Sequence, residues 1–301
     1  MSKQLSDSYP GNTTPLSDED LKAVVSAKYS AEHPKPQTVA GPINQDQDIS
    51  KFHTEVVSLP SQGVLYPETN PLHTGQLNMK YMTAKEEDIL TSQNLIKTGV
   101  VIDKLLQSLI VDNIRYDDLL IGDKNAVLIA ARILAYGKDY DVEISCPKCA
   151  ETSKHVIDLT LFDEKNLQVG EYSPGVNEFW FELPASKRKV SYKCLTSGDE
   201  RSIENELKGL KKISKISGVD PEMTTRLKYI ITSVDGNTDI NFIRSFVDKE
   251  LFSRDSFALR KEIQKITPDI KMEFPFECPN CSHEDPNMGM PLDVGFFWPR
   301  V

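Results

Sequence analysis

The chain has 301 residues, enough for one large or two small domains with a hydrophobic core. Its formal net charge of -10 argues against a general nucleic-acid-binding role, because neutralising phosphates requires clustered positive charge. No stretch approaches the roughly 20 apolar residues that a membrane span requires, and the first residues lack the apolar core of a signal peptide, so its five cysteines are expected to stay reduced.

Residues 1–50 are predicted to form a disordered N-terminal arm. Prolines and polar residues dominate this segment, and no hydrophobic period is sustained. One short helix is expected within it, because Ser17 is placed as an N-cap and Leu21, Val24 and Val25 follow at helical spacing. Such a helix either docks on a partner or has no role, and the sequence leaves both interpretations open.

Residues 51–145 are predicted to form an α+β core. Hydrophobic patterns indicate two strands followed by two helices, at 55–59, 75–82, 83–95 and 100–111. Asp123 is expected to be the N-cap of the most apolar helix, 126–136, and Gly137 is placed to end it. We expect this helix in the middle of the core.

Two C-x-x-C pairs, Cys146 with Cys149 and Cys278 with Cys281, give the clearest chemical signal. A turn of this spacing points two thiolates at one position, which is half of a tetrahedral zinc site. The two pairs together predict one structural zinc ion with four cysteine ligands. Two disulfides, two unrelated turns or a redox-active C-x-x-C are the alternatives, and iron can occupy the same four thiolates.

The flanks of the cysteine pairs predict a zinc ribbon that is split over 140–165 and 270–301. Three flanking segments read as strands of hairpins: 141–145, 154–160 and 271–277. His155 lies in one of them and is expected to be an exposed strand residue, since four cysteines already satisfy zinc. Everything between Cys149 and Cys278 would then be an insertion whose ends the metal holds together.

Residues 170–267 are predicted to be a β-hairpin plus a helical subdomain. Runs at 178–183 and 189–195 alternate as paired strands do, and Cys194 in the second is expected to be buried. Helical patterns follow at 197–210, 221–236, 240–246 and 256–263. Four lysines would line one face of the first helix, as a solvated surface or as a contact for an acidic protein: Lys208, Lys211, Lys212 and Lys215. The predicted fold class is therefore α+β, a helical core with β-hairpins and a split four-cysteine zinc ribbon that encloses this insertion.

Three aromatic residues near the end of the chain, Phe296, Phe297 and Trp298, would be costly to leave in water. We expect them to close the core of the ribbon, with an anchor for a neighbouring protein as the alternative. No P-loop, G-x-G-x-x-G, H-E-x-x-H or G-x-S-x-G pattern occurs. Since a four-cysteine site also leaves no open position for catalysis, the sequence predicts a protein that is not an enzyme.

Five segments occur in an order that resembles a known family. They are LPSQGVLYP at 59–67, KEEDIL at 85–90, IGD at 121–123, RILAYG at 132–137 and CPKC at 146–149. The ordered set is similar to the base-plate protein family of contractile-tailed bacteriophages, related to the baseplate hub component of T-even phages. This resemblance implies a hub component or hub-assembly factor that contacts other baseplate or tail proteins, in the virion or in the host cytoplasm during assembly.

Two further functions stay open at the level of sequence. A tail assembly chaperone would hold the apolar segment of a tape-measure protein and be absent from the mature virion. A zinc-ribbon regulator would bind nucleic acid through a basic stripe, and the overall acidity of the chain counts against it.

Overall fold

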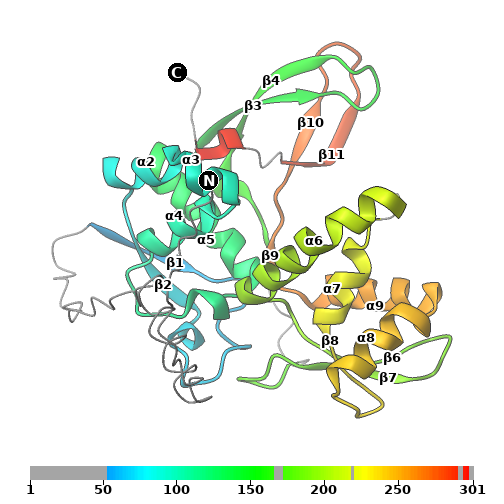
Figure 1. Cartoon of the computed structure of the whole chain (residues 1–301). Coiled ribbons are helices and arrows are strands. Elements are labelled where there is room, and N and C mark those ends of the chain that lie inside the picture. Colours follow the sequence, from blue (N-terminus) through cyan, green and yellow to red (C-terminus); the bar gives the residue numbers. More distant parts are fainter. Residues whose placement is uncertain (1–52, 166–171, 218–219, 291–293, 298–301) are drawn as a thin grey trace, which may run out of the picture. The chain divides into compact units, whose positions relative to one another are not determined.

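The structure is a computed structural model, and it describes residues 53–165, 172–217, 220–290 and 294–297. The predicted N-terminal arm and its short helix, with Leu21, Val24 and Val25, lie outside these residues, as does Trp298. The described residues form helices α2 to α9 and several small antiparallel sheets, which confirms the α+β fold class, and the hairpin β3–β4 projects beyond the helices (Figure 1).

The first sheet is a hairpin of β1 (Thr54–Ser58) and β2 (Gln76–Lys80). The loop between these strands folds back on itself and contains a short 3-10 helix, η2 (Pro71–Thr74). Gly63 allows this close approach, because it has a φ of 78° and an added Cβ would lie 2.1 Å from the carbonyl oxygen of His73.

Four helices follow: α2 (Ala84–Thr91), α3 (Gln93–Thr98), α4 (Val101–Leu109) and α5 (Ile121–Tyr136). The prediction of one helix across 83–95 was wrong, because the chain is extended at Ser92 between α2 and α3. The prediction of Asp123 as an N-cap was also wrong. Leu120 is the N-cap of α5, and Asp123 is fully buried in its first turn.

Among its described residues, the insertion contains a three-stranded sheet and the four helices α6 to α9. The sheet has the order β6 (Phe179–Glu182), β7 (Lys189–Tyr192) and β8 (Ile231–Val234), and the predicted hairpin is its first pair. The helices are α6 (Ser197–Ser217), α7 (Glu222–Ile230), α8 (Ile240–Lys249) and α9 (Ser253–Ile266). The prediction that the second helix continues to residue 236 was wrong after Ile230, because Ile231–Val234 form strand β8, which pairs with β7.

Charged pairs join the helices of the insertion. The Arg244 guanidinium donates two hydrogen bonds to the Glu206 carboxylate, at 2.8 and 2.6 Å, which connects α8 to α6. Arg226 on α7 makes an equivalent pair with Glu200 on α6. Bidentate arginine–carboxylate contacts of this kind fix the relative orientation of two helices better than single ion pairs do.

The insertion begins and ends at one place. The short strand β5 (Glu164–Lys165), which leads into it, pairs with β9 (Asp269–Ile270), which leads out of it. Helix α5 packs beside this point, and an added Cβ at Gly122 would lie 1.8 Å from the carbonyl oxygen of Pro268. The chain therefore enters and leaves the insertion through two paired strands, of which β9 lies against α5.

Candidate metal centre

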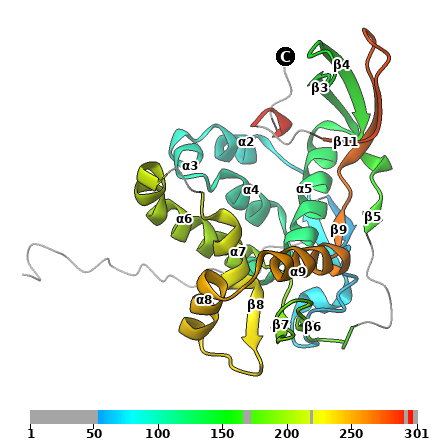
Figure 2. The same ribbon diagram turned by 90° about the vertical axis from the view of Figure 1, so that its right-hand side faces the viewer.

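Two β-hairpins carry the cysteine pairs. The first consists of β3 (Asp139–Ser145) and β4 (Thr152–Asp158), and the second of β10 (Glu273–Glu277) and β11 (Glu284–Gly289). Figures 1 and 2 show the hairpins side by side, although they are far apart in the sequence. These are the hairpins that the strand patterns beside the cysteines predicted.

The two cysteine turns have the same backbone geometry. In each turn the N–H of the first cysteine donates to the carbonyl five residues later, and its own carbonyl accepts from the N–H four residues later, all at 2.8 to 3.0 Å. The residue after the second cysteine is left-handed in both turns, with φ of 60° at Ala150 and 51° at Ser282. Two turns with one geometry thus present their sulfurs in equivalent ways.

The four sulfurs converge. All lie within 4.8 Å of one another, and the Sγ atoms of Cys146 and Cys281, like those of Cys149 and Cys278, are 3.7 Å apart. Zinc–sulfur bonds of about 2.3 Å in a tetrahedron place neighbouring sulfurs about 3.8 Å apart. The residues present therefore fit a four-coordinate metal ion with both turns contributing ligands.

The alternative chemistries fit the geometry less well. A disulfide requires sulfurs about 2.05 Å apart, and all five cysteines are free thiols here. A redox-active C-x-x-C relies on a helix N-terminus to lower its thiol pKa, whereas both pairs lie in turns between antiparallel strands. Among the described residues, no other group of cysteine, histidine or acidic side chains is close enough to hold a metal ion.

The local environment shifts the pKa values of two of the cysteine thiols in opposite directions. A hydrogen bond from the backbone N–H of Glu151 lowers the pKa of Cys149 to about 7. Burial and the neighbouring sulfurs raise the pKa of Cys281 to about 12. Four thiolates so close together repel one another, and a bound cation removes that repulsion while displacing the remaining protons.

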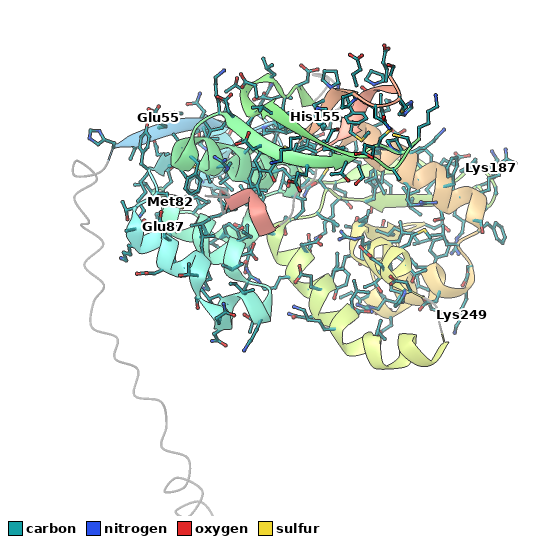
Figure 3. All side chains as sticks on the ribbon, turned by 90° about the horizontal axis from the view of Figure 1, so that it is seen from above. Glu55, Met82, Glu87, His155, Lys187 and Lys249 are labelled. Atoms are coloured by element: carbon teal, nitrogen blue, oxygen red, sulfur yellow. The ribbon has the colours of Figure 1, made fainter. Side chains whose placement is uncertain are left out.

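His155 is not a fifth ligand. Its Nε2 is 2.8 Å from the hydroxyl of Ser153, and its ring packs 5.0 Å from the ring of Phe276 on the second hairpin. The side chain is half-buried, not exposed as predicted, because its ring packs against Phe276 of the second hairpin; Figure 3 labels His155 on the first hairpin. It thus supports the metal centre by packing.

Two of the three aromatic residues near the end of the chain lie in the described part and are buried. Phe296 and Phe297 are 2% and 1% exposed, and the ring of Phe296 packs edge-on against Tyr140 on β3 at 5.1 Å. The guanidinium of Arg132 lies over the same Tyr140 ring and over that of Tyr136. This burial favours the interpretation that the two phenylalanines close the core beside the first hairpin.

The predicted lysine face is described only in part. Lys208 pairs with Glu204 one turn earlier on α6, with 3.4 Å between the charged atoms. Both side chains are about half exposed, and such pairs contribute little to stability. The side chains of Lys211, Lys212 and Lys215 lie outside the described residues.

A buried polar cluster was missed by the sequence analysis. The carboxylate of Asp123 accepts hydrogen bonds from the backbone N–H of Ser61 at 2.9 Å and from the hydroxyl of Tyr66 at 2.6 Å. The Tyr66 oxygen in turn accepts from the N–H of Leu120. Burial raises the pKa of Asp123 and that of Tyr66, and the hydrogen bonds oppose the rise at Asp123. The only signal in the sequence was the presence of polar residues inside two of the segments that resemble the family.

These features define an α+β protein with a candidate four-cysteine metal centre between two hairpins, and with a large insertion in the chain between the two cysteine pairs. A family model described as T4 bacteriophage base plate protein matches residues 54–289, a span that includes all four cysteines, and the chain belongs to this family. No curated protein and no solved structure matches the chain. Within its described part, no helix has the length and apolar character needed to span a membrane.

Proposed function

We propose that the chain is a non-enzymatic structural component of the hub of a phage tail baseplate, and that its cysteine cluster holds one structural zinc ion. The observation that carries the first part is the family match, which covers the core, the insertion and both hairpins. The observation that carries the second is the 3.7 Å spacing of the sulfurs. Other baseplate and tail proteins are the partners that this role requires.

Zinc suits this role because it has no redox chemistry and prefers four tetrahedral ligands of this type. It would fix the orientation of the two hairpins, whose direct contacts include the packing of His155 against Phe276 and a contact of 3.8 Å between the Asn280 amide nitrogen and the Cys149 sulfur. A bound metal contributes its binding free energy to the folded state. The centre is therefore proposed to stabilise a shape, while contacts with neighbouring subunits are made elsewhere on the surface.

Metal analysis tests the centre. Purified protein is expected to contain about one zinc ion per chain, and Cys278→Ser is expected to lose it. Cys194→Ser is the matched control, because Cys194 is equally buried but lies outside the cluster. Iron in place of zinc would correct the identity of the metal, and full metal content in the Cys278 variant would refute the site.

Mass spectrometry of purified infectious particles, beside partly assembled baseplates, tests the role. Peptides of this chain in finished particles, at a fixed ratio to other baseplate proteins, are the expected result. Their presence in the intermediates alone would identify a transient assembly factor or chaperone instead. Their absence from both preparations would refute the proposed function and leave the metal result unaffected.

A further inference from the structure

Strand β6 has an edge that no other strand occupies. It pairs with β7 through four consecutive residue pairs, from Phe179 with Tyr192 to Glu182 with Lys189. It is the first strand in the order β6-β7-β8, and no strand among the described residues pairs with its other side. An unpaired edge offers backbone N–H and C=O groups to any extended segment that approaches it.

One face of strand β6 packs into the core through Phe179, and the other face exposes the large side chain of Trp180 to solvent. Phe179 is buried and packs against the rings of Tyr172 and Tyr192, at 5.4 and 5.6 Å. Trp180 points to the opposite face and is 62% exposed. A surface hollow of about 320 Å³ is lined by Trp180, its neighbours Phe181 and Glu182, and Lys189. A rigid strand with an exposed tryptophan beside a hollow is a suitable anchor for a partner.

Charge decides which occupant fits. Trp180 and Glu182 lie two residues apart in β6, so the alternation of a strand places both on one face. Glu178, directly before the strand, lies on the same face: its exposed carboxylate accepts a hydrogen bond at 3.2 Å from the hydroxyl of Thr232. That hydroxyl also contacts the hydroxyl of Ser191, the residue paired with Trp180. A second copy that paired antiparallel around Trp180 would bring Glu178 opposite Glu182 of that copy, and like charges at opposed positions are destabilising. A segment with a lysine or arginine at both positions gains attraction instead.

We propose that the edge of β6 is a docking site for an extended segment of another protein, with an apolar residue over Trp180 and basic residues opposite Glu178 and Glu182. The segment adds a fourth strand to the sheet. Lys187, in the turn between β6 and β7, lies 3.9 Å from Glu182, and both side chains are more than half exposed. Because such an exposed ion pair contributes little free energy, a basic residue of a partner can replace Lys187 as the contact of Glu182. Figure 3 shows Lys187 at the outer edge of the view.

Peptide binding to the full chain tests this proposal. The probe is a nine-residue peptide of alternating valine and threonine with lysines two residues on either side of a central valine, and its matched control has glutamates there. The lysine peptide is expected to bind at least tenfold more tightly than the glutamate peptide and to slow amide hydrogen exchange at 179–182. Exchanging both acids, Glu178→Lys with Glu182→Lys, is expected to reverse the preference.

Two further variants separate docking from non-specific attraction. Trp180→Ala is expected to weaken binding of the lysine peptide about tenfold, whereas Phe252→Ala, at a site that is 57% exposed, leaves it unchanged. Equal affinity for the two peptides, absence of binding at millimolar concentration, or protection outside β6 would overturn the proposal. Self-association of the chain through β6 would also overturn it, because the occupant would then be a second copy. None of these outcomes depends on the role in the baseplate.

Discussion

The hydroxyl of Tyr66 is the most informative single group to remove. It donates to the buried carboxylate of Asp123 and accepts from the backbone N–H of Leu120, so it joins the loop after β1 to the start of α5. Tyr66→Phe keeps the ring and deletes only this bridge. Because the ring is 5% exposed, water does not readily replace the hydroxyl.

The expected loss follows from the groups left behind. The carboxylate keeps its hydrogen bond from Ser61 but loses the shorter one, and the N–H of Leu120 loses its acceptor. An unsatisfied buried group costs about 1–3 kcal/mol, and more when it is charged. We therefore expect Tyr66→Phe to lower the free energy of unfolding by about 3–5 kcal/mol, a large part of the roughly 5–15 kcal/mol typical of folded domains.

The loss should also depend on pH. The hydrogen bond from Tyr66 lowers the pKa of Asp123, so its removal raises that pKa further in the folded variant. An acid with a raised folded-state pKa loses stability as pH rises, and the penalty is expected to be larger at pH 8 than at pH 5.

Urea denaturation of the variant and of Tyr81→Phe measures the effect. The hydroxyl of Tyr81 also donates to a carboxylate, that of Glu55 at 2.9 Å, but at an exposed site. Its loss is expected to change the free energy of unfolding far less than the loss of the Tyr66 hydroxyl, because water replaces the hydrogen bond at an exposed site. Equal effects of the two substitutions would refute the reasoning that burial makes the Tyr66 bridge important.

Two further substitutions test other packed sites. Burial by itself raises the pKa of Glu86, but hydrogen bonds from Lys80 and Thr83 outweigh it and lower this pKa to about 2. A carboxyl whose pKa is lower in the folded state stabilises that state at pH values above its unfolded-state pKa. Glu86→Gln is therefore expected to be about 3 kcal/mol less stable than the native chain at pH 7. In denaturation measured as a function of pH, this difference should vanish as pH falls from about 4.5 toward 2. Gly122→Ala should lower the thermal midpoint by clashing with Pro268, whereas Gly209→Ala, which meets nothing within 4 Å, should preserve or raise it.

The cysteine turns were predictable because their information is local. A C-x-x-C spacing and alternating flanks specify a hairpin with two sulfurs at its tip, whatever the rest of the chain does. That the two tips meet followed only from the coordination number of the metal. Helices α8 and α9 were likewise predicted, since each has a clear apolar face.

Two of the wrong predictions, that of Asp123 as an N-cap and that of a helix through residues 231–236, share a physical cause. An aspartate before an apolar run is normally an N-cap, but the carboxylate of Asp123 is used by Ser61 and Tyr66, about sixty residues earlier in the chain. The segment Ile231–Val234 continues an apolar pattern after α7, and only pairing with β7 makes it a strand. Partners distant in sequence decided both cases, and the pattern of one segment does not reveal them.

The two ends of the insertion are joined at two separate places, and losing one of these contacts need not disrupt the other. The four-cysteine cluster joins the hairpin tips, while β5 pairs with β9 where the insertion begins and ends, close to the packing of Gly122 against Pro268. Removing the proposed zinc ion with a chelator should therefore speed amide exchange in both hairpins but leave α5 and the sheet of the insertion protected. The edge of β6 belongs to that sheet, so the lysine peptide should still bind the stripped protein. Loss of protection throughout the chain would instead mean that the metal holds the whole fold together.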